Sequence, residues 1–177
     1  YLQPEAIKAI VMASAVHNIE GDSRVSDRDG VGGINAALAY EIVDHGRYNV
    51  AADGWYDFRT VYLSSFDVNG NLHYNVPISR GEKVRVVLTW DSHPEINDPY
   101  SNDLLYSNLD LKVYRPNNGA LVASSLRNYD NFEIVEFTAD ETGVYDVAIN
   151  RAFWNTGLEY IGVAWIKDAT YLPDLRN

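Results

Sequence analysis

The chain has 177 residues, a formal net charge of −11 and 46% hydrophobic residues. This length and composition suit one globular domain with a small additional piece, so neither disorder nor a metal-stapled miniprotein is needed to explain them. The negative charge repels phosphate backbones and anionic lipid surfaces, and we expect no nucleic-acid partner and no membrane partner. The sequence contains no cysteine, which excludes disulfides and thiolate metal sites.

The first predicted element is a helix over residues 4–15. Pro4 and Glu5 suit the first turn of a helix. Proline lacks the backbone N–H that would have no partner there, and the negative charge of glutamate is favourable at a helix N-terminus. Apolar and small side chains then recur on one stripe. We expect this helix to bury the following residues of the stripe: Ile7, Ile10 and Val11.

A second helix is predicted from about Ile34 to Asp44. Gly32 and Gly33 supply a tight entry turn, and His45-Gly46 ends the helix. One side of this helix carries its apolar residues, namely Ile34, Ala37, Leu38 and Ile42.

Beyond about Ala52 the sequence changes to short runs of β-branched and aromatic residues, separated by Asn, Gly, Pro and Asp. This pattern predicts about eight strands, the number that a jelly roll uses. The expected strands are Tyr56–Leu63, Leu72–Pro77, Lys83–Trp90, Asp110–Tyr114, Leu121–Ser124, Glu133–Thr138, Gly143–Asn150 and Tyr160–Trp165.

The segment Lys83–Trp90 shows the alternation of a strand most clearly. Its Val84, Val86, Leu88 and Trp90 point one way, and Lys83 and Arg85 point the other way. We therefore expect one face in the core and one face in water. The predicted fold class is mainly β, a jelly-roll-type antiparallel β-sandwich preceded by two short helices.

Two stretches of the helical region resemble the subtilisin-like serine protease family. Residues 4–15, PEAIKAIVMASA, are similar to the late helix Thr-Pro-Glu-x-Ile-Lys-x-Leu-Leu-x-x-Thr-Ala, and residues 29–39, DGVGGINAALA, are similar to Gly-x-Gly-x-Val-Asn-Ala-x-x-Ala. Four later landmarks follow the order of the C-terminal β-barrel of certain subtilases. They are residues 87–92 (VLTWDS), 107–116 (SNLDLKVYRP), 130–135 (DNFEIV) and 142–147 (TGVYDV).

This resemblance covers most of the chain and implies its organisation. Residues 1–50 would be the helical C-terminal remnant of a catalytic domain, residues 51–166 a jelly-roll domain and residues 167–177 a tail. The chain would be a non-catalytic region that stabilises a secreted, extracellular endopeptidase, with the catalytic Asp, His and Ser in an N-terminal part. Its partner would be that catalytic domain.

Compared with the nucleophile segment of the subtilisin-like family, the chain contains no candidate for the attacking serine. Val11 stands where the attacking serine of a Ser-Met-Ala segment would be, and no Gly-Thr-Ser or His-Gly-Thr stretch is present. Ser14 is expected to be a small residue in helix packing. The four histidines show no metal-binding spacing, Glu133 is expected to be structural, and Tyr145 is expected to lie in the core or at a corner.

The resemblance also implies a calcium site, because family members often hold Ca²⁺ between the loop after Trp-Ser-Asp and the Asn-Asp-Leu-Asp segment. Calcium takes six to eight oxygen ligands from carboxylates, amides and carbonyls. A solvated acidic loop, with Asp110 bonded to backbone amides, is the alternative. By position the candidate ligands are Asp91 or Ser92, Asn108 and Asp110, with Asp98, Asn102 and Asp103 in the same polar loop.

A different class of function stays open at this point. Jelly rolls commonly bind glycans, and aromatic rings in loops stack on sugars. The rings that suit this role are Tyr100, Tyr106, Tyr129 and Trp154. A carbohydrate-binding or partner-binding β-sandwich module is therefore the alternative to the protease accessory region.

Overall fold

The computed structural model describes residues 2–16, 30–91, 93–94 and 103–167. Two helices, α1 (Pro4–Ser14) and α2 (Ala36–Asp44), precede the strands, and a short 3₁₀ helix, η1 (Leu63–Ser65), follows the first strand. The strands are β1 (Gly54–Val61), β2 (Asn71–Ile78), β3 (Lys83–Trp90), β4 (His93–Pro94), β5 (Asp103–Leu104), β6 (Ser107–Tyr114), β7 (Leu121–Ser125), β8 (Phe132–Thr138), β9 (Gly143–Trp154) and β10 (Glu159–Lys167).

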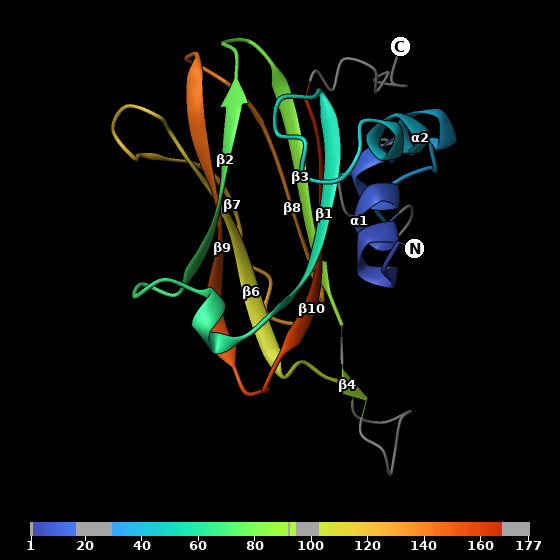
Figure 1. The fold of residues 1–177 in the computed structure, drawn as a ribbon, viewed down its shortest axis with the longest axis vertical. Coiled ribbons are helices and arrows are strands. Elements are labelled where there is room, and N and C mark those ends of the chain that lie inside the picture. Colours follow the sequence, from blue (N-terminus) through green and yellow to red (C-terminus); the bar gives the residue numbers. More distant parts are fainter. Residues whose placement is uncertain (1, 17–29, 92, 95–102, 168–177) are drawn as a thin grey trace.

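Eight of these strands form two antiparallel four-stranded sheets, with the orders β1-β10-β3-β8 and β2-β9-β6-β7. The sheets face each other, with both helices outside the first sheet (Figure 1). This arrangement confirms the predicted mainly β sandwich. Each expected strand is present. However, β6 begins at Ser107 and β9 continues to Trp154, because these ends pair with each other beyond a register shift at Asn108/Leu109.

The core between the sheets is built from large aromatic side chains and β-branched residues. Tyr145 is fully buried and its hydroxyl donates a hydrogen bond to the carbonyl oxygen of Glu141 (3.0 Å), which confirms its predicted core position. The bulkiest buried rings are Trp55, Trp90, Trp165, Tyr74 and Tyr145.

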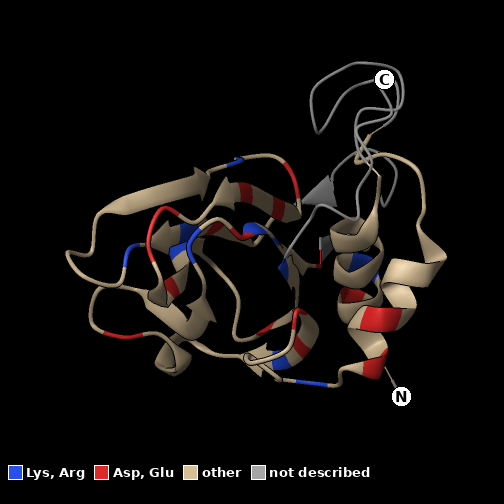
Figure 2. Ribbon diagram, turned by 90° about the horizontal axis from the view of Figure 1, so that it is seen from above, with Lys and Arg blue, Asp and Glu red and all other residues tan. Residues whose placement is uncertain are grey.

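The other face of the first sheet is also covered, because α1 lies across it (Figures 1 and 2). Ala9 and Ile10 of the helix share a second apolar cluster with Val87 of β3 and Ala164 of β10. As a result Arg85 is only 2% exposed. The predicted wet face of β3 is therefore wrong: the alternation was correct, but the helix replaces water on that face.

The helix buries a different stripe from the one that the sequence predicted. Ile10 is buried as expected, but Ile7 is 48% exposed and Val11 is only partly buried. Small residues let the helix backbone approach the sheet closely. The side of α1 that packs on the sheet consists of Ala6, Ala9, Ile10, Met12 and Ala13.

Helix α2 is shorter at its start than predicted. Leu38 and Ile42 are buried, as the pattern indicated, but Ile34 is 77% exposed. The side chain of Asn35 accepts a hydrogen bond from the amide of Leu38 (3.1 Å), so Asn35 is the N-cap and Ile34 lies outside the helix. No helix of the described residues is long and apolar enough to cross a membrane.

Both ends of α1 are fixed to the first sheet by polar contacts. At its start, the Thr89 hydroxyl donates to the carbonyl oxygen of Glu5 (2.7 Å). At its end, Arg85 Nη1 donates to the carbonyl oxygens of Ala13 (2.8 Å) and Ala15 (2.7 Å). The last carbonyls of a helix have no partner within the helix, and a cation there also complements the helix dipole.

Arg85 is therefore predicted to be the main polar anchor of α1. An Arg85→Met substitution leaves two buried carbonyls without this donor and removes one partner of Glu136, which Arg85 Nε contacts at 2.5 Å. We expect the free energy of unfolding, measured by urea denaturation, to fall by about 3 kcal/mol. Lys83→Met on the exposed start of the same strand is the control, and an equal loss in both variants would contradict the anchor.

Gly162 provides the room for this docking. A Cβ at Gly162 would overlap the backbone of Glu5, whereas a Cβ at Gly157 meets nothing within 4 Å. We expect Gly162→Ala to lower the free energy of unfolding by about 2 kcal/mol through this overlap. Gly157→Ala should leave it nearly unchanged. The two variants can be compared by thermal unfolding, and unchanged stability in Gly162→Ala would show that α1 does not pack this closely.

Candidate functional site

Three of the predicted calcium ligands can be located with their side chains, namely Asp91, Asn108 and Asp110. Ser92, Asp98 and Asn102 lie outside the described residues. Asp103 belongs to β5, and its side chain is also outside the described part of the chain.

Asn108 and Asp110 lie on the same side of β6, because Leu109 between them points into the core. The Asp110 carboxylate pairs with Lys112 Nζ at 3.1 Å. Asn108 Nδ2 donates to Asn128 Oδ1 at 3.2 Å, while Asn108 Oδ1 is buried and has no hydrogen-bond partner. An acceptor in this state is costly unless a donor or cation reaches it.

A buried glutamate, Glu133, lies at the start of β8, and its position in the sequence does not indicate that it lies near Asp110. Its side chain is fully buried, Oε1 accepts a hydrogen bond from the amide of Arg127 (2.6 Å), and Oε2 has no partner. Burial raises the pKa of Glu133 to about 7, and the nearby charge of Asp110 acts in the same direction. Bonds from Ser125 and from the Arg127 amide favour the ionised form and oppose this shift.

Strand alternation places Glu133 on the opposite side from Phe132 and Ile134. Those two side chains pack toward α1, whereas Val135 lies in the core between the sheets. A glutamate on the core side of an apolar strand was thus a visible signal in the sequence. The bond from the Arg127 amide to its carboxylate agrees with the structural role expected for Glu133.

We call Asn108, Asp110 and Glu133 the β6/β8 oxygen cluster. The loop between β7 and β8 joins its members, since Arg127 contacts Glu133 and Asn128 contacts Asn108. Each member carries an oxygen of the kind that calcium prefers. However, Asn108 and Asp110 lie on the outer side of β6, whereas Glu133 points to the core side of β8, and none of the described contacts joins Glu133 to the other two. Within the described ranges, no group of three or more His, Asp or Glu side chains has the geometry of a metal site.

Asp91 has a different neighbourhood. It follows β3 and hydrogen-bonds the carboxyl group of Glu5 on α1. Burial raises the pKa of Glu5, and the Asp91 carboxylate raises it further. Among the described contacts, none joins Asp91 to Asn108 or Asp110, so the structure places Asn108 and Asp110 on one side of β6 and Asp91 beside α1.

The residues considered for catalysis or metal binding have ordinary structural contacts. Ser14 is fully buried in α1 and its Oγ donates to the carbonyl oxygen of Val11 (3.1 Å), which confirms its packing role. His73 Nδ1 lies 2.8 Å from Asp146, and a ring nitrogen of His45 lies 3.0 Å from the carbonyl oxygen of Gly54. His17 and the side chain of His93 are outside the described residues.

The aromatic rings considered for glycan binding are in different environments. Trp154 packs edge-on against Phe66, with the ring centroids 5.4 Å apart. Tyr129 is 94% exposed and Tyr106 is 36% exposed. Tyr100 lies outside the described residues, so the described rings leave Tyr129 as the most open stacking surface of this set.

The sequence matches no protein-family model and no curated protein. Among solved structures, the chain is similar to the Aeromonas hydrophila protein PliG, a periplasmic inhibitor of g-type lysozyme, with a TM-score of 0.42 and 11% identity over 66% of this chain and 87% of that chain. It is also similar to the pre-peptidase C-terminal domain of a Bacillus anthracis collagenase, with a TM-score of 0.40 and 10% identity over 61% and 86% of the two chains. A third is the C-terminal CBM6 of the marine laminarinase LamC from Zobellia galactanivorans, with a TM-score of 0.33 and 8% identity over 62% and 99%. At this distance none of them assigns a function to the chain.

Proposed function

We propose that the chain is a non-catalytic C-terminal accessory region of a secreted subtilisin-like serine endopeptidase, and that it stabilises the catalytic domain. The proposal rests on the motifs at residues 4–15 and 29–39 and on their order before a β-sandwich. The described part of the chain has no serine beside a histidine base, so peptide cleavage would belong to other parts of the protease.

The observation that carries this proposal is the apolar outer surface of the helix layer. One side of the layer packs on the first sheet, and apolar side chains also project from the layer into solvent. Exposed apolar side chains on a helix layer, here set among the exposed acidic residues Glu41 and Asp44, suit burial against a second body. The exposed residues are Ile7 (48%), Ile34 (77%), Tyr40 (67%) and Val43 (37%).

A charge placed on this surface tests whether the surface is exposed in the isolated chain and buried in the full-length protease. In the isolated chain, Ile34→Glu should leave the melting temperature unchanged, because Ile34 is 77% exposed there. In the full-length protease the same change should shorten the thermal half-life severalfold, since an unpaired charge would be buried against the catalytic domain. Val68→Glu, at a fully exposed residue of the β1–β2 connection, is the matched control.

Deleting residues 53–177 should also shorten the thermal half-life of the full-length protease. An unchanged half-life in both experiments would reject the accessory role.

Calcium binding is the second component of the proposal. The β6/β8 oxygen cluster would hold the ion if Glu133, Asp110 and the Asn108 carbonyl oxygen turned toward one another from the two sides of β6. The ion would then stabilise the ionised form of Glu133, whose pKa burial raises to about 7. The other residues proposed from the sequence to complete the coordination are Asp91, Ser92, Asp98, Asn102 and Asp103.

The raised pKa of Glu133 gives this component a pH test. Between the usual value of 4.5 and about 7, the unfolded chain releases this proton while the folded chain keeps it, so without calcium stability should fall as the pH rises through this window. At pH 8, calcium at about 100 times its Kd should restore about 3 kcal/mol and raise the melting temperature. Glu133→Gln should remove both the slope and the calcium response, whereas Glu41→Gln on the exposed side of α2 should keep them. An equal calcium response in Glu133→Gln would reject the cluster as the site.

The alternative function, glycan binding, has one feature in its favour. Within the described residues, no helix covers the outer face of the β2-β9-β6-β7 sheet, and this face carries a polar ladder (Figure 1). Asn150 Nδ2 donates to Asn71 Oδ1 (2.8 Å), and Lys112 Nζ donates to Asn150 Oδ1 (3.2 Å). Retention of the chain on an insoluble polysaccharide, lost in Tyr129→Ala, would favour this function over the accessory role.

A further inference from the structure

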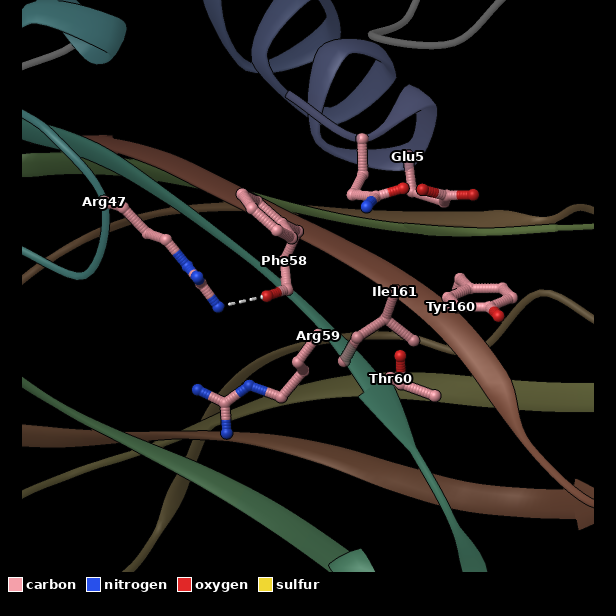
Figure 3. A pocket seen from close by; sticks show the side chains of 8 residues that line it. Glu5, Arg47, Phe58, Arg59, Thr60, Tyr160 and Ile161 are labelled. Atoms are coloured by element: carbon pink, nitrogen blue, oxygen red, sulfur yellow. Dashed lines mark hydrogen bonds between the residues drawn. The ribbon is translucent and has the colours of Figure 1, made fainter. Parts of the chain in front are cut away.

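A pocket of about 270 Å³ lies beside the edge strand β1. Its walls come from α1, from the connection between α2 and β1, and from strands β1 and β10 (Figure 3). We call it the β1 pocket. It is lined by Gln3, Glu5, Arg47, Phe58, Arg59, Thr60, Tyr160 and Ile161.

The two arginines of the β1 pocket are held by one buried carboxylate. Asp57 is only 1% exposed, and its two oxygens accept hydrogen bonds from Arg47 Nε (2.9 Å), from Arg59 Nε (2.9 Å) and from the Tyr74 hydroxyl (2.9 Å). Two guanidinium groups share one carboxylate, so the group carries one excess positive charge in a chain whose net charge is −11.

Both guanidinium groups are held in position, and each keeps an N–H donor group that makes no described contact. Arg47 stacks over the Phe58 ring at 4.0 Å and gives Nη2 to the carbonyl oxygen of Phe58 (2.6 Å), as Figure 3 shows. Arg59 lies over the Tyr74 ring at 4.9 Å. Among the described contacts, neither Nη1 group has a partner, and the side chains are 49% and 32% exposed. Fixed, partly exposed guanidinium groups lose little entropy when they bind an anion.

A strained residue holds Arg47 in place. Tyr48 has a φ of 58°, the only positive φ of a non-glycine residue in the described chain. Its amide donates to the carbonyl oxygen of Tyr56 (2.8 Å), and its ring packs on Trp55 with centroids 5.7 Å apart. Such backbone strain persists only where the surroundings impose it, and it is concentrated at binding sites.

Glu5 provides an acceptor in the same pocket. Its side chain is 5% exposed, and Oε2 is buried without a hydrogen-bond partner. Figure 3 shows Glu5 descending from α1, with Tyr160 of β10 on the same side and Arg47 across the pocket. The pocket therefore combines a cationic side, a carboxyl oxygen that needs a donor, and two aromatic rings, Phe58 and Tyr160.

We propose that the β1 pocket binds the carboxyl end of a peptide chain. The terminal carboxylate is received by Arg47, the N–H of the last peptide bond donates to Glu5 Oε2, and the last side chain lies against Phe58 and Tyr160. One excess positive charge matches a carboxylate rather than a dianionic phosphate. Pockets for drug-sized ligands begin at about 300 Å³, so this volume suits a single terminal residue.

Three small probes separate the parts of this recognition. N-acetylphenylalanine carries both the carboxylate and the N–H, N-acetylphenylalanine amide lacks the carboxylate, and 3-phenylpropionate lacks the N–H. In an NMR titration that follows the arginine side-chain resonances, N-acetylphenylalanine is expected to bind with a Kd on the order of 1 mM. The amide should bind at least tenfold more weakly, and 3-phenylpropionate severalfold more weakly.

Arg47→Gln is the decisive variant, because Arg59 and Tyr74 still hold Asp57 in it. It should weaken N-acetylphenylalanine at least tenfold, while Arg80→Gln, at an exposed residue that does not line the pocket, should leave the Kd unchanged. Equal binding of the acid and its amide, or no effect of Arg47→Gln, would overturn the proposal. Equal binding of 3-phenylpropionate would overturn the peptide assignment in favour of free carboxylates, and tighter binding of inorganic phosphate would overturn the charge argument.

Discussion

The docking of α1 on the outer face of the first sheet is the constraint on which the other features depend. Arg85 is a buried cation whose partners are the carbonyl oxygens at the end of α1 and the carboxylate of Glu136. If the helix left the sheet, Arg85 would keep Glu136 on β8 but would lose the two carbonyl oxygens of α1. The close approach at Gly162 and the Thr89 bond fix the other end of the helix. Helix and sheet therefore share one core, and the position of α1 in turn sets where Glu5 lies beside the β1 pocket.

Two buried carboxylates of the sandwich illustrate two ways of tolerating a charge in a protein interior. Asp57 has two guanidinium groups and a tyrosine hydroxyl as partners, and the result is a cationic group with donors left over. Glu133 receives bonds from the Ser125 side chain and the Arg127 amide, and its Oε2 has none, so its pKa rises to about 7. The first arrangement suits an anion, and the second suits a proton or a cation. The two proposed ligands, a peptide carboxylate and calcium, follow from this difference.

The sequence predicted the strands well because each one buries alternate side chains over a short local segment. Lys83–Trp90 is a strand with the expected bounds. The errors concern what covers each face. The outer face of β3 was expected to be wet, and Ile7 and Ile34 were expected to be buried. An amphipathic pattern identifies an apolar stripe but does not identify the surface against which it packs, and the small residues Ala9 and Ala13 share the apolar cluster between the helix and the sheet.

By itself, the sequence determined the class of the fold, the number of main strands, the core position of Tyr145 and the packing role of Ser14, because these follow from local periodicity and side-chain chemistry. Only the tertiary structure decided which polar groups meet. The charge of Asp110 raises the pKa of Glu133 because β6 and β8 belong to facing sheets, and Arg47 reaches Asp57 because Tyr48 adopts a left-handed conformation beside β1. Such meetings depend on sheet order and loop geometry, which are set by contacts between residues far apart in the chain, and a local pattern contains no record of them.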